Sequence, residues 1–170
     1  MPTPQEWMQA LVDYGIPLAK RKMEEGRLDL GSWGNVKECG TFACLLGWSA
    51  MEPNMQALGL GVVLDEVTSP FLKGRGYQSM LSVTLDGVAV TRPQEELGVE
   101  MGLSRWEADA LFGPAHQLEF WEDRVDAEEC DELDDPLPEE REMELREELA
   151  NEILADMKAG NRVVEMQDGC

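Results

Sequence analysis

The sequence predicts an α+β fold: a mostly helical single domain with one β-hairpin and a long acidic C-terminal helix. Three observations lead to this class. Apolar residues recur at helical spacing in several segments, two β-rich runs are joined by the dipeptide Asp86-Gly87, and an apolar stripe flanked by acidic residues follows residue 139. A length of 170 residues corresponds to one domain, and 43% hydrophobic residues are enough for a core.

Two helices are expected to dominate the first part of the chain. Apolar residues at helical spacing over 7–18 predict an opening helix, and Gly15 and Pro17 predict an interruption of it. A second helix is apolar on almost all sides, which is typical of a buried element. It is predicted to start with Thr41 as its cap and to end at Pro53.

The strand signals come next along the chain. Residues 54–75 give no single pattern, although Val62-Val63-Leu64 is compatible with a short strand. Residues 77–91 predict the hairpin, because alternating β-forming residues flank Asp86-Gly87, a dipeptide favoured in two-residue turns.

Two short helices are predicted over 93–112. Each opens with a capping sequence, Thr91-Arg92-Pro93-Gln94 and Ser104-Arg105-Trp106-Glu107. The pair has the outline of a helix-turn-helix. Glu107 and Asp109 would face phosphates there, with Arg105 as the only basic residue, so we expect compact packing rather than DNA recognition.

The negative charge is concentrated in the C-terminal half. The chain has a formal net charge of −21, of which residues 93–170 carry −19 and residues 1–92 only −2. Residues 119–148 alone hold 16 acidic and three basic side chains. We therefore divide the chain into a globular core over 1–118 with the hairpin 77–91, an acidic linker over 119–138, and an acidic amphipathic helix over 139–160 that packs on the core or on a partner.

Three segments resemble a group of small uncharacterised bacteriophage and bacterial proteins. They are Asp29-Leu30-Gly31-Ser32-Trp33-Gly34, Cys39-Gly40-Thr41-Phe42-Ala43-Cys44-Leu45-Leu46-Gly47-Trp48, and Leu97-Gly98 followed by Gly102-Leu103-Ser104 and Glu107-Ala108-Asp109-Ala110-Leu111-Phe112. The resemblance covers about 29–112. It implies a phage or mobile-element origin. The group has no established activity that the resemblance could assign to this chain, and the acidic extension from residue 119 lies outside its motifs.

Cys39 and His116 are the candidate catalytic residues of an alternative interpretation as a Cys/His hydrolase. Cys39 is expected just before a helix N-terminus, which would stabilise a thiolate, and His116 is the only histidine that can serve as its base. The competing interpretation, which we favour, treats Cys39 and Cys44 as small packing residues. We predict no cofactor.

Metal sites are weaker alternatives. Cys39, Cys44, Cys130 and His116 are suitable zinc ligands, but they lack a second closely spaced pair. The carboxylates over 126–135 lack the alternation and central glycine of a calcium-binding loop, so a solvated linker is the better explanation. We therefore predict no metal.

The acidic half leaves three interpretations: solubility, an interaction tail without a substrate, and mimicry of nucleic acid. Direct nucleic-acid binding is disfavoured because this charge would repel phosphates. Carboxylates on a helix can instead mimic nucleic acid and bind a basic host or phage protein, such as a restriction or CRISPR effector. The candidate partner-binding residues are Glu128, Asp131, Glu132, Asp134, Asp135, Glu139, Glu140, Glu144, Glu147 and Glu148.

A third alternative is a small structural or assembly protein that forms homo-oligomers through Leu145, Leu149 and Ile153. For all three alternatives the expected location is the cytoplasm of the host cell. No apolar stretch is long enough to span a membrane, the polar N-terminus does not resemble a secretion signal, and four unevenly spaced cysteines suit a reducing compartment.

Overall fold

The computed structural model describes residues 2–30, 33–37, 40–114, 118–121, 123–125 and 137–162. In chain order, its elements are α1 (Pro4–Ala10), η1 (Leu11–Gly15), α2 (Ile16–Glu24), β1 (Asn35–Lys37), β2 (Gly40–Phe42), α3 (Leu45–Met51), α4 (Pro53–Ala57), β3 (Leu60–Glu66), α5 (Pro70–Gly74), β4 (Tyr77–Leu85), β5 (Val88–Ala89), α6 (Pro93–Glu100), α7 (Arg105–Phe112), η2 (Leu118–Trp121) and α8 (Glu139–Ala159). The predicted α+β class and the long C-terminal helix are confirmed.

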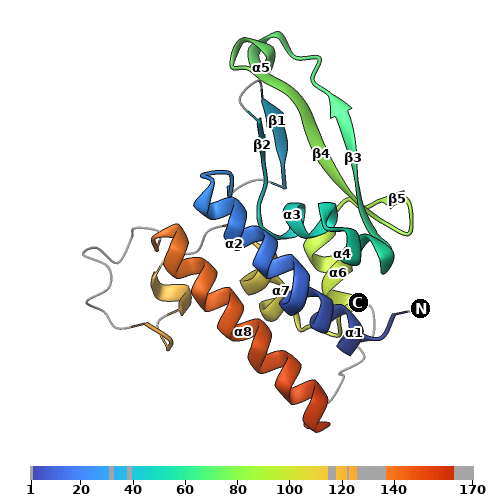
Figure 1. The fold of residues 1–170 in the computed structure, drawn as a ribbon, viewed down its shortest axis with the longest axis vertical. Helices are drawn as coiled ribbons and strands as arrows, with labels where there is room; N and C mark the ends of the chain where they lie inside the picture. Colours follow the sequence, from blue (N-terminus) through green and yellow to red (C-terminus); the bar gives the residue numbers. More distant parts are fainter. Residues whose placement is uncertain are drawn as a thin grey trace.

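Most helices form a body from which the sheet extends as an arm (Figure 1). We call β3, α5 and β4, together with the adjoining β1 and β2, the sheet arm. The strand order within the described residues is β2-β1-β4-β3, and β5 pairs with the end of β4 nearest the body. All of these pairings are antiparallel, and α8 lies on the opposite side of the body from the arm.

The predicted hairpin is present as β4 and β5, but it belongs to a larger sheet. Its turn has positive φ at Asp86 (50°) and Gly87 (80°), as a two-residue hairpin turn requires. β3 pairs with β4 over seven residues, with Val63 opposite Ser82. The short run Val62-Val63-Leu64 therefore does belong to a strand. β1 and β2 have three residues each, too few for a recognisable alternation.

The interruption of the first helix is also confirmed. η1 is a π-helical segment between α1 and α2, so the helix continues through a locally widened turn. A Cβ atom on Gly15 would lie 2.6 Å from the Ser49 hydroxyl, so glycine allows this turn to approach α3 closely. Pro17 lies just after η1 and, having no backbone N–H, removes one donor from the continuous helix, which accounts for a local departure from α-helical hydrogen bonding.

Two predicted helix caps are wrong. Thr41 lies in β2, opposite Val36 of β1, and α3 begins at Leu45 with Cys44 as its N-cap. Pairing with β1 takes up the backbone that the prediction assigned to the first helical turn. α6 begins after Arg92 without a side-chain cap. By contrast, the Ser104–Glu107 capping box of α7 is present, with bonds of 2.8 and 3.2 Å.

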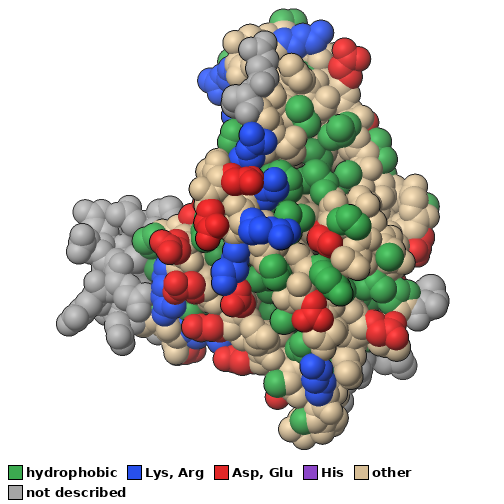
Figure 2. Space-filling view, in the orientation of Figure 1, with side chains coloured by type: hydrophobic (Ala, Val, Ile, Leu, Met, Phe, Trp, Pro, Cys, Tyr) green, Lys and Arg blue, Asp and Glu red, His purple; other side chains and the backbone are tan. Residues whose placement is uncertain are grey.

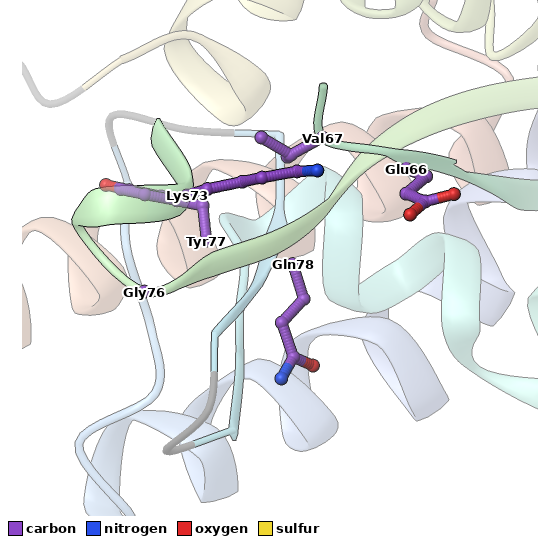
Figure 3. Close-up of a pocket in the computed structure, with 6 residues that line it drawn as sticks. All are labelled: Glu66, Val67, Lys73, Gly76, Tyr77 and Gln78. Atoms are coloured by element: carbon purple, nitrogen blue, oxygen red, sulfur yellow. The ribbon is translucent and has the colours of Figure 1, made fainter. Parts of the chain in front are cut away.

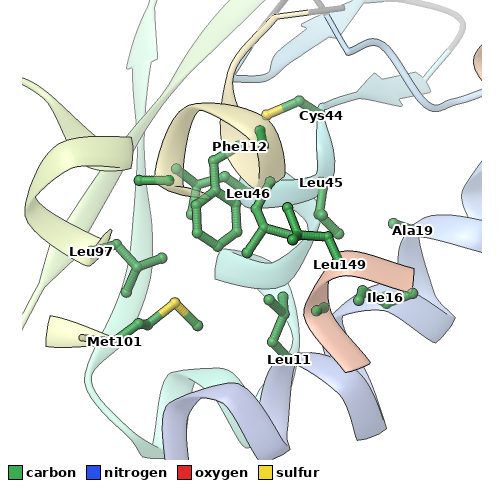
Figure 4. Close-up of a cluster of buried hydrophobic side chains, with 14 of the residues drawn as sticks. Leu11, Ile16, Ala19, Cys44, Leu45, Leu46, Leu97, Met101, Phe112 and Leu149 are labelled. Carbon is green, nitrogen blue, oxygen red and sulfur yellow. The ribbon is translucent and has the colours of Figure 1, made fainter. Parts of the chain in front are cut away.

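The apolar stripe of α8 is buried in the core. Leu145, Leu149 and Ile153 have 0%, 3% and 2% of their surface exposed. In Figure 4, Leu149 lies beside Leu45 and the α2 residues Ile16 and Ala19. The same chain therefore already covers the three side chains through which the sequence predicted a homo-oligomer, and self-association itself stays a prediction. Gly160, with φ 69°, ends α8 where the sequence predicted.

Among the described residues, no helix combines the length and the apolar character that crossing a membrane requires.

Candidate functional site

α8 displays a row of carboxylates because its other face is held in the core. Glu139, Glu140, Glu144 and Glu148 are exposed, and Glu147 is half-buried. The 21-residue helix thus fixes five of the ten candidate partner-binding residues on one rigid element. The other five, Glu128, Asp131, Glu132, Asp134 and Asp135, lie outside the described residues.

Basic side chains neutralise part of this surface. Arg141 lies 3.0 Å from Glu144 and 4.0 Å from Glu148, and Lys20 of α2 lies 2.9 Å from Glu147. In Figure 2, acidic and basic side chains accordingly alternate where α8 lies. These pairs are exposed or half-exposed, so each contributes little stability, but each lowers the negative potential that a partner would meet.

Arg124, which precedes α8 in the chain, forms an ion pair with Glu152 of α8. Two bonds of 2.6 and 2.9 Å join the guanidinium to the carboxylate. Hydrogen bonding from Arg124 lowers the pKa of Glu152, and the same bond raises the pKa of Arg124. Because Arg124 follows η2, this contact holds the end of that segment on α8.

Glu139 and Glu140 are the least neutralised of the candidates. Neither forms an ion pair with another residue of the described ranges. Burial, with a smaller effect from the nearby Asp29 carboxylate, raises the pKa of Glu139. Both residues occupy the first turn of α8, where the helix dipole favours negative charge.

A buried polar network beneath this surface was missed by the sequence analysis. Glu142 and Arg146 form an ion pair of 3.2 Å with both side chains fully buried. The Trp121 indole N–H donates to both carboxylate oxygens at 3.1 Å. Arg146 also donates to the carbonyls of Leu111 and Gly113, each at 2.8 Å. The network therefore ties α8 to η2 and to the end of α7.

The signal for this network was present but ambiguous. Glu142 and Arg146 are spaced by four residues, and Arg146 precedes Leu149 by three, so both lie on the apolar side of the helix. Such a pair is usually a solvated surface contact. Only the position of α7 shows that the guanidinium meets the carbonyl groups at the end of that helix.

The candidate catalytic pair gains no support. Cys39 and His116 both lie outside the described residues, as does Cys130. The argument for a reactive Cys39 is wrong in one respect, because the helix begins at Leu45 and not directly after that residue. Cys44 is the N-cap instead: its sulfur accepts from Gly47 N–H at 3.4 Å, and burial raises the pKa of its thiol.

No three potential metal ligands cluster within the residues that the structure describes. The zinc candidates other than Cys44, and the carboxylates over 126–135 that were considered for calcium, lie outside those residues. The absence of metal therefore stays a prediction.

The carboxylates of the helix pair serve packing. Glu107 caps α7 and pairs with Arg162, whose Nη1 lies 2.8 Å from Glu107 Oε2. Asp109 accepts from Gln94 of α6 at 2.7 Å. A Cβ on Gly98 would lie 2.8 Å from that of Ala108, so the two helices cross closely. These contacts explain the acidic residues without a nucleic-acid ligand.

Two pockets formed by the described residues lie away from α8. One, of about 280 Å³, lies at the tip of the sheet arm and is lined by Glu66, Val67, Lys73, Gly76, Tyr77 and Gln78. In Figure 3 the Lys73 side chain extends toward Val67. Another of similar volume lies between α6 and α7, where Glu95 is 3.5 Å from Arg92 and 3.9 Å from Arg105. Neither contains a nucleophile with an adjacent base.

Comparison with protein-family models, with curated proteins and with solved structures finds no match to this chain.

Proposed function

We propose that this chain is a binding protein whose acidic C-terminal half occupies a basic surface of another protein. The fixed row of carboxylates on α8 carries the proposal. Because Leu145, Leu149 and the Glu142–Arg146 pair hold the helix on the core, Glu139, Glu140, Glu144 and Glu148 keep a constant spacing in solvent. A fixed spacing reduces the conformational entropy that a partner's binding would cost.

The sequence adds further acidic residues just before α8. Glu128, Asp131, Glu132, Asp134 and Asp135 precede α8 within 30 residues that carry a net charge of −13. The electric field of this negative charge accelerates the encounter with a cationic protein surface and orients the two proteins as they approach. Nucleic acid presents the same sign of charge, so proteins that bind its backbone are the class whose surfaces fit best.

The partner we propose is a nucleic-acid-handling defence or replication protein, with the host cytoplasm as the site of action. A restriction or CRISPR effector fits this description. The resemblance over 29–112 to phage and bacterial proteins supports the host setting, and the acidic half supports the class of partner. Binding there would inhibit the partner by competing with its nucleic acid.

Charge-neutral variants test the proposal. In the first variant Glu139, Glu140, Glu144 and Glu148 become Gln, and in the second Glu128→Gln, Asp131→Asn, Glu132→Gln and Asp134→Asn are combined. A matched control changes Glu24, Glu25, Glu96 and Glu100 to Gln, since these are also exposed glutamates and their loss alters the net charge equally. Tagged wild-type protein is used to capture partners from bacterial lysate, followed by elution with salt.

The expected partner is basic, binds DNA or RNA itself, and releases it when this protein is added. Each test variant should bind that partner at least about tenfold more weakly, with a shallower dependence on salt, while the control binds like wild type. An equal loss of binding by the control variant would show that net charge alone causes the effect, and it would contradict a specific site on α8. Captured proteins without nucleic-acid affinity, or full binding by both test variants, would contradict the proposal.

A further inference from the structure

The outer edge of β3 is an open edge of the sheet in the part of the chain that the structure describes. β3 is a terminal strand in the sheet of the described residues, and its seven residues pair on one side only, with β4. Val63 and Leu64 lie on opposite faces of the strand and are 48% and 54% exposed. An edge strand of this length with apolar residues at its centre is a template for a further strand.

The hydrogen bonds between β3 and β4 determine which residues of β3 direct their backbone N–H and C=O groups toward the unpaired edge. Gly59 C=O accepts from Asp86 N–H at 2.8 Å, and Val67 N–H donates to Gln78 C=O at 3.0 Å. Antiparallel pairs alternate between bonded and non-bonded positions, so the odd-numbered residues from 59 to 67 bond to β4. Leu60, Val62, Leu64 and Glu66 then direct their N–H and C=O groups toward the open edge.

We propose that this edge pairs with the β3 strand of a second copy, antiparallel, about a two-fold axis at Val63. In this register Val62 lies opposite the partner copy's Leu64, and Leu60 lies opposite the partner copy's Glu66. All four outward-directed residues then occupy hydrogen-bonded positions. Val63 meets its own counterpart at a non-bonded position, where side chains are closest. All seven residues of β3 would then pair with the partner copy.

A second copy fits this edge because the register places apolar residues opposite each other at its centre and brings no carboxylates face to face. Asp65 would lie opposite Gly61 of the other strand, so no carboxylate faces another across the pair. The two Asp65 side chains would be four residues apart along the strands, roughly 13 Å, which exceeds the Debye length of about 8 Å at physiological ionic strength. The arm also extends away from α8, so the most acidic surfaces of two copies stay apart (Figure 1).

A charge-swap experiment on the full chain tests the register. Wild type, Val63→Lys and Val63→Glu are studied alone, and the two variants also as an equimolar mixture, by sedimentation equilibrium over a range of concentrations. Wild type should approach twice the 19.0 kDa mass of one chain. Like charges facing each other should raise the dissociation constant of each single variant at least about tenfold, and the mixture should recover the dimer.

Val99→Lys is the matched control, because Val99 is a 67% exposed valine on α6, away from the arm. It should dimerise like wild type. A wild-type chain that stays monomeric would overturn the proposal, as would a dimer that both Val63 variants retain. A mixture that remains monomeric would overturn the two-fold register at Val63. Circular dichroism of each variant verifies that the chain is folded.

Discussion

The Arg146 guanidinium lies 3.2 Å from the Glu142 carboxylate at a place that solvent does not reach. Burial lowers the pKa of Arg146, and the charge of Glu142 opposes this effect. The pair is surrounded by compensating groups, namely the Trp121 indole and the carbonyls of Leu111 and Gly113. Because this pair lies on the buried side of α8, it fixes the helix to the core while the opposite side presents carboxylates to solvent.

Breaking this pair should destabilise the protein strongly. We expect Arg146→Met to reduce the free energy of unfolding by about 3–5 kcal/mol, because Glu142 remains as an uncompensated buried charge. The double variant Glu142→Leu/Arg146→Met removes both charges and should lose less than Arg146→Met alone. Urea denaturation of the three proteins measures this order. A double variant less stable than the single one would show that the charges themselves are not the dominant cost.

The Glu107–Arg162 contact should make stability depend on acid pH. Burial of Glu107 disfavours its ionised form, but hydrogen bonds from Arg162 and Ser104 outweigh this, so the pKa lies below its ordinary value of 4.5. The carboxylate therefore stabilises the fold fully above pH 4.5, and this contribution disappears as the pH falls through the folded-state pKa. Melting temperatures of wild type and Glu107→Gln should differ at pH 6 and converge in acid. A constant difference would contradict this assignment.

The packing around Gly47 leaves no room for a side chain. A Cβ atom at this position would lie 1.8 Å from the Trp33 carbonyl oxygen, a backbone atom that cannot move alone. We expect Gly47→Ala to cost about 3 kcal/mol of unfolding free energy, at the upper end of overpacking. Gly74→Ala is the control, because a Cβ there meets nothing within 4 Å. It should be neutral or stabilising by up to about 1 kcal/mol. Thermal and urea unfolding distinguish the two.

Cys44 should be inert in the folded protein. It is 1% exposed, and burial raises the pKa of its thiol, so little reactive thiolate forms near neutral pH. Alkylation with iodoacetamide, followed by mass spectrometry of peptides, should leave Cys44 unmodified in buffer and modify it in urea. Modification in buffer at the rate of the unfolded chain would show that the start of α3 opens readily.

The sequence alone determined the features that depend on neighbours along the chain. Asp86-Gly87 lies between two strand-forming runs, and both residues readily adopt the positive φ that a two-residue turn requires. The hairpin was therefore predictable. Ser104 and Glu107 cap one helix end through bonds spanning three residues. Gly160 ends α8 because glycine accepts the left-handed conformation. The division of charge between the two halves also needs no structure.

Only the tertiary structure decided the features that depend on distant partners. Thr41 became part of a strand because β1 lies beside it, although a local cap was equally compatible with the sequence. Glu142 and Arg146 are buried because η2 and the end of α7 supply their hydrogen-bond partners from more than 20 residues away. Glu147 and Glu152 are neutralised by Lys20 and Arg124 for the same reason. Local patterns fix backbone conformation, whereas burial and charge depend on which segments the fold brings into contact.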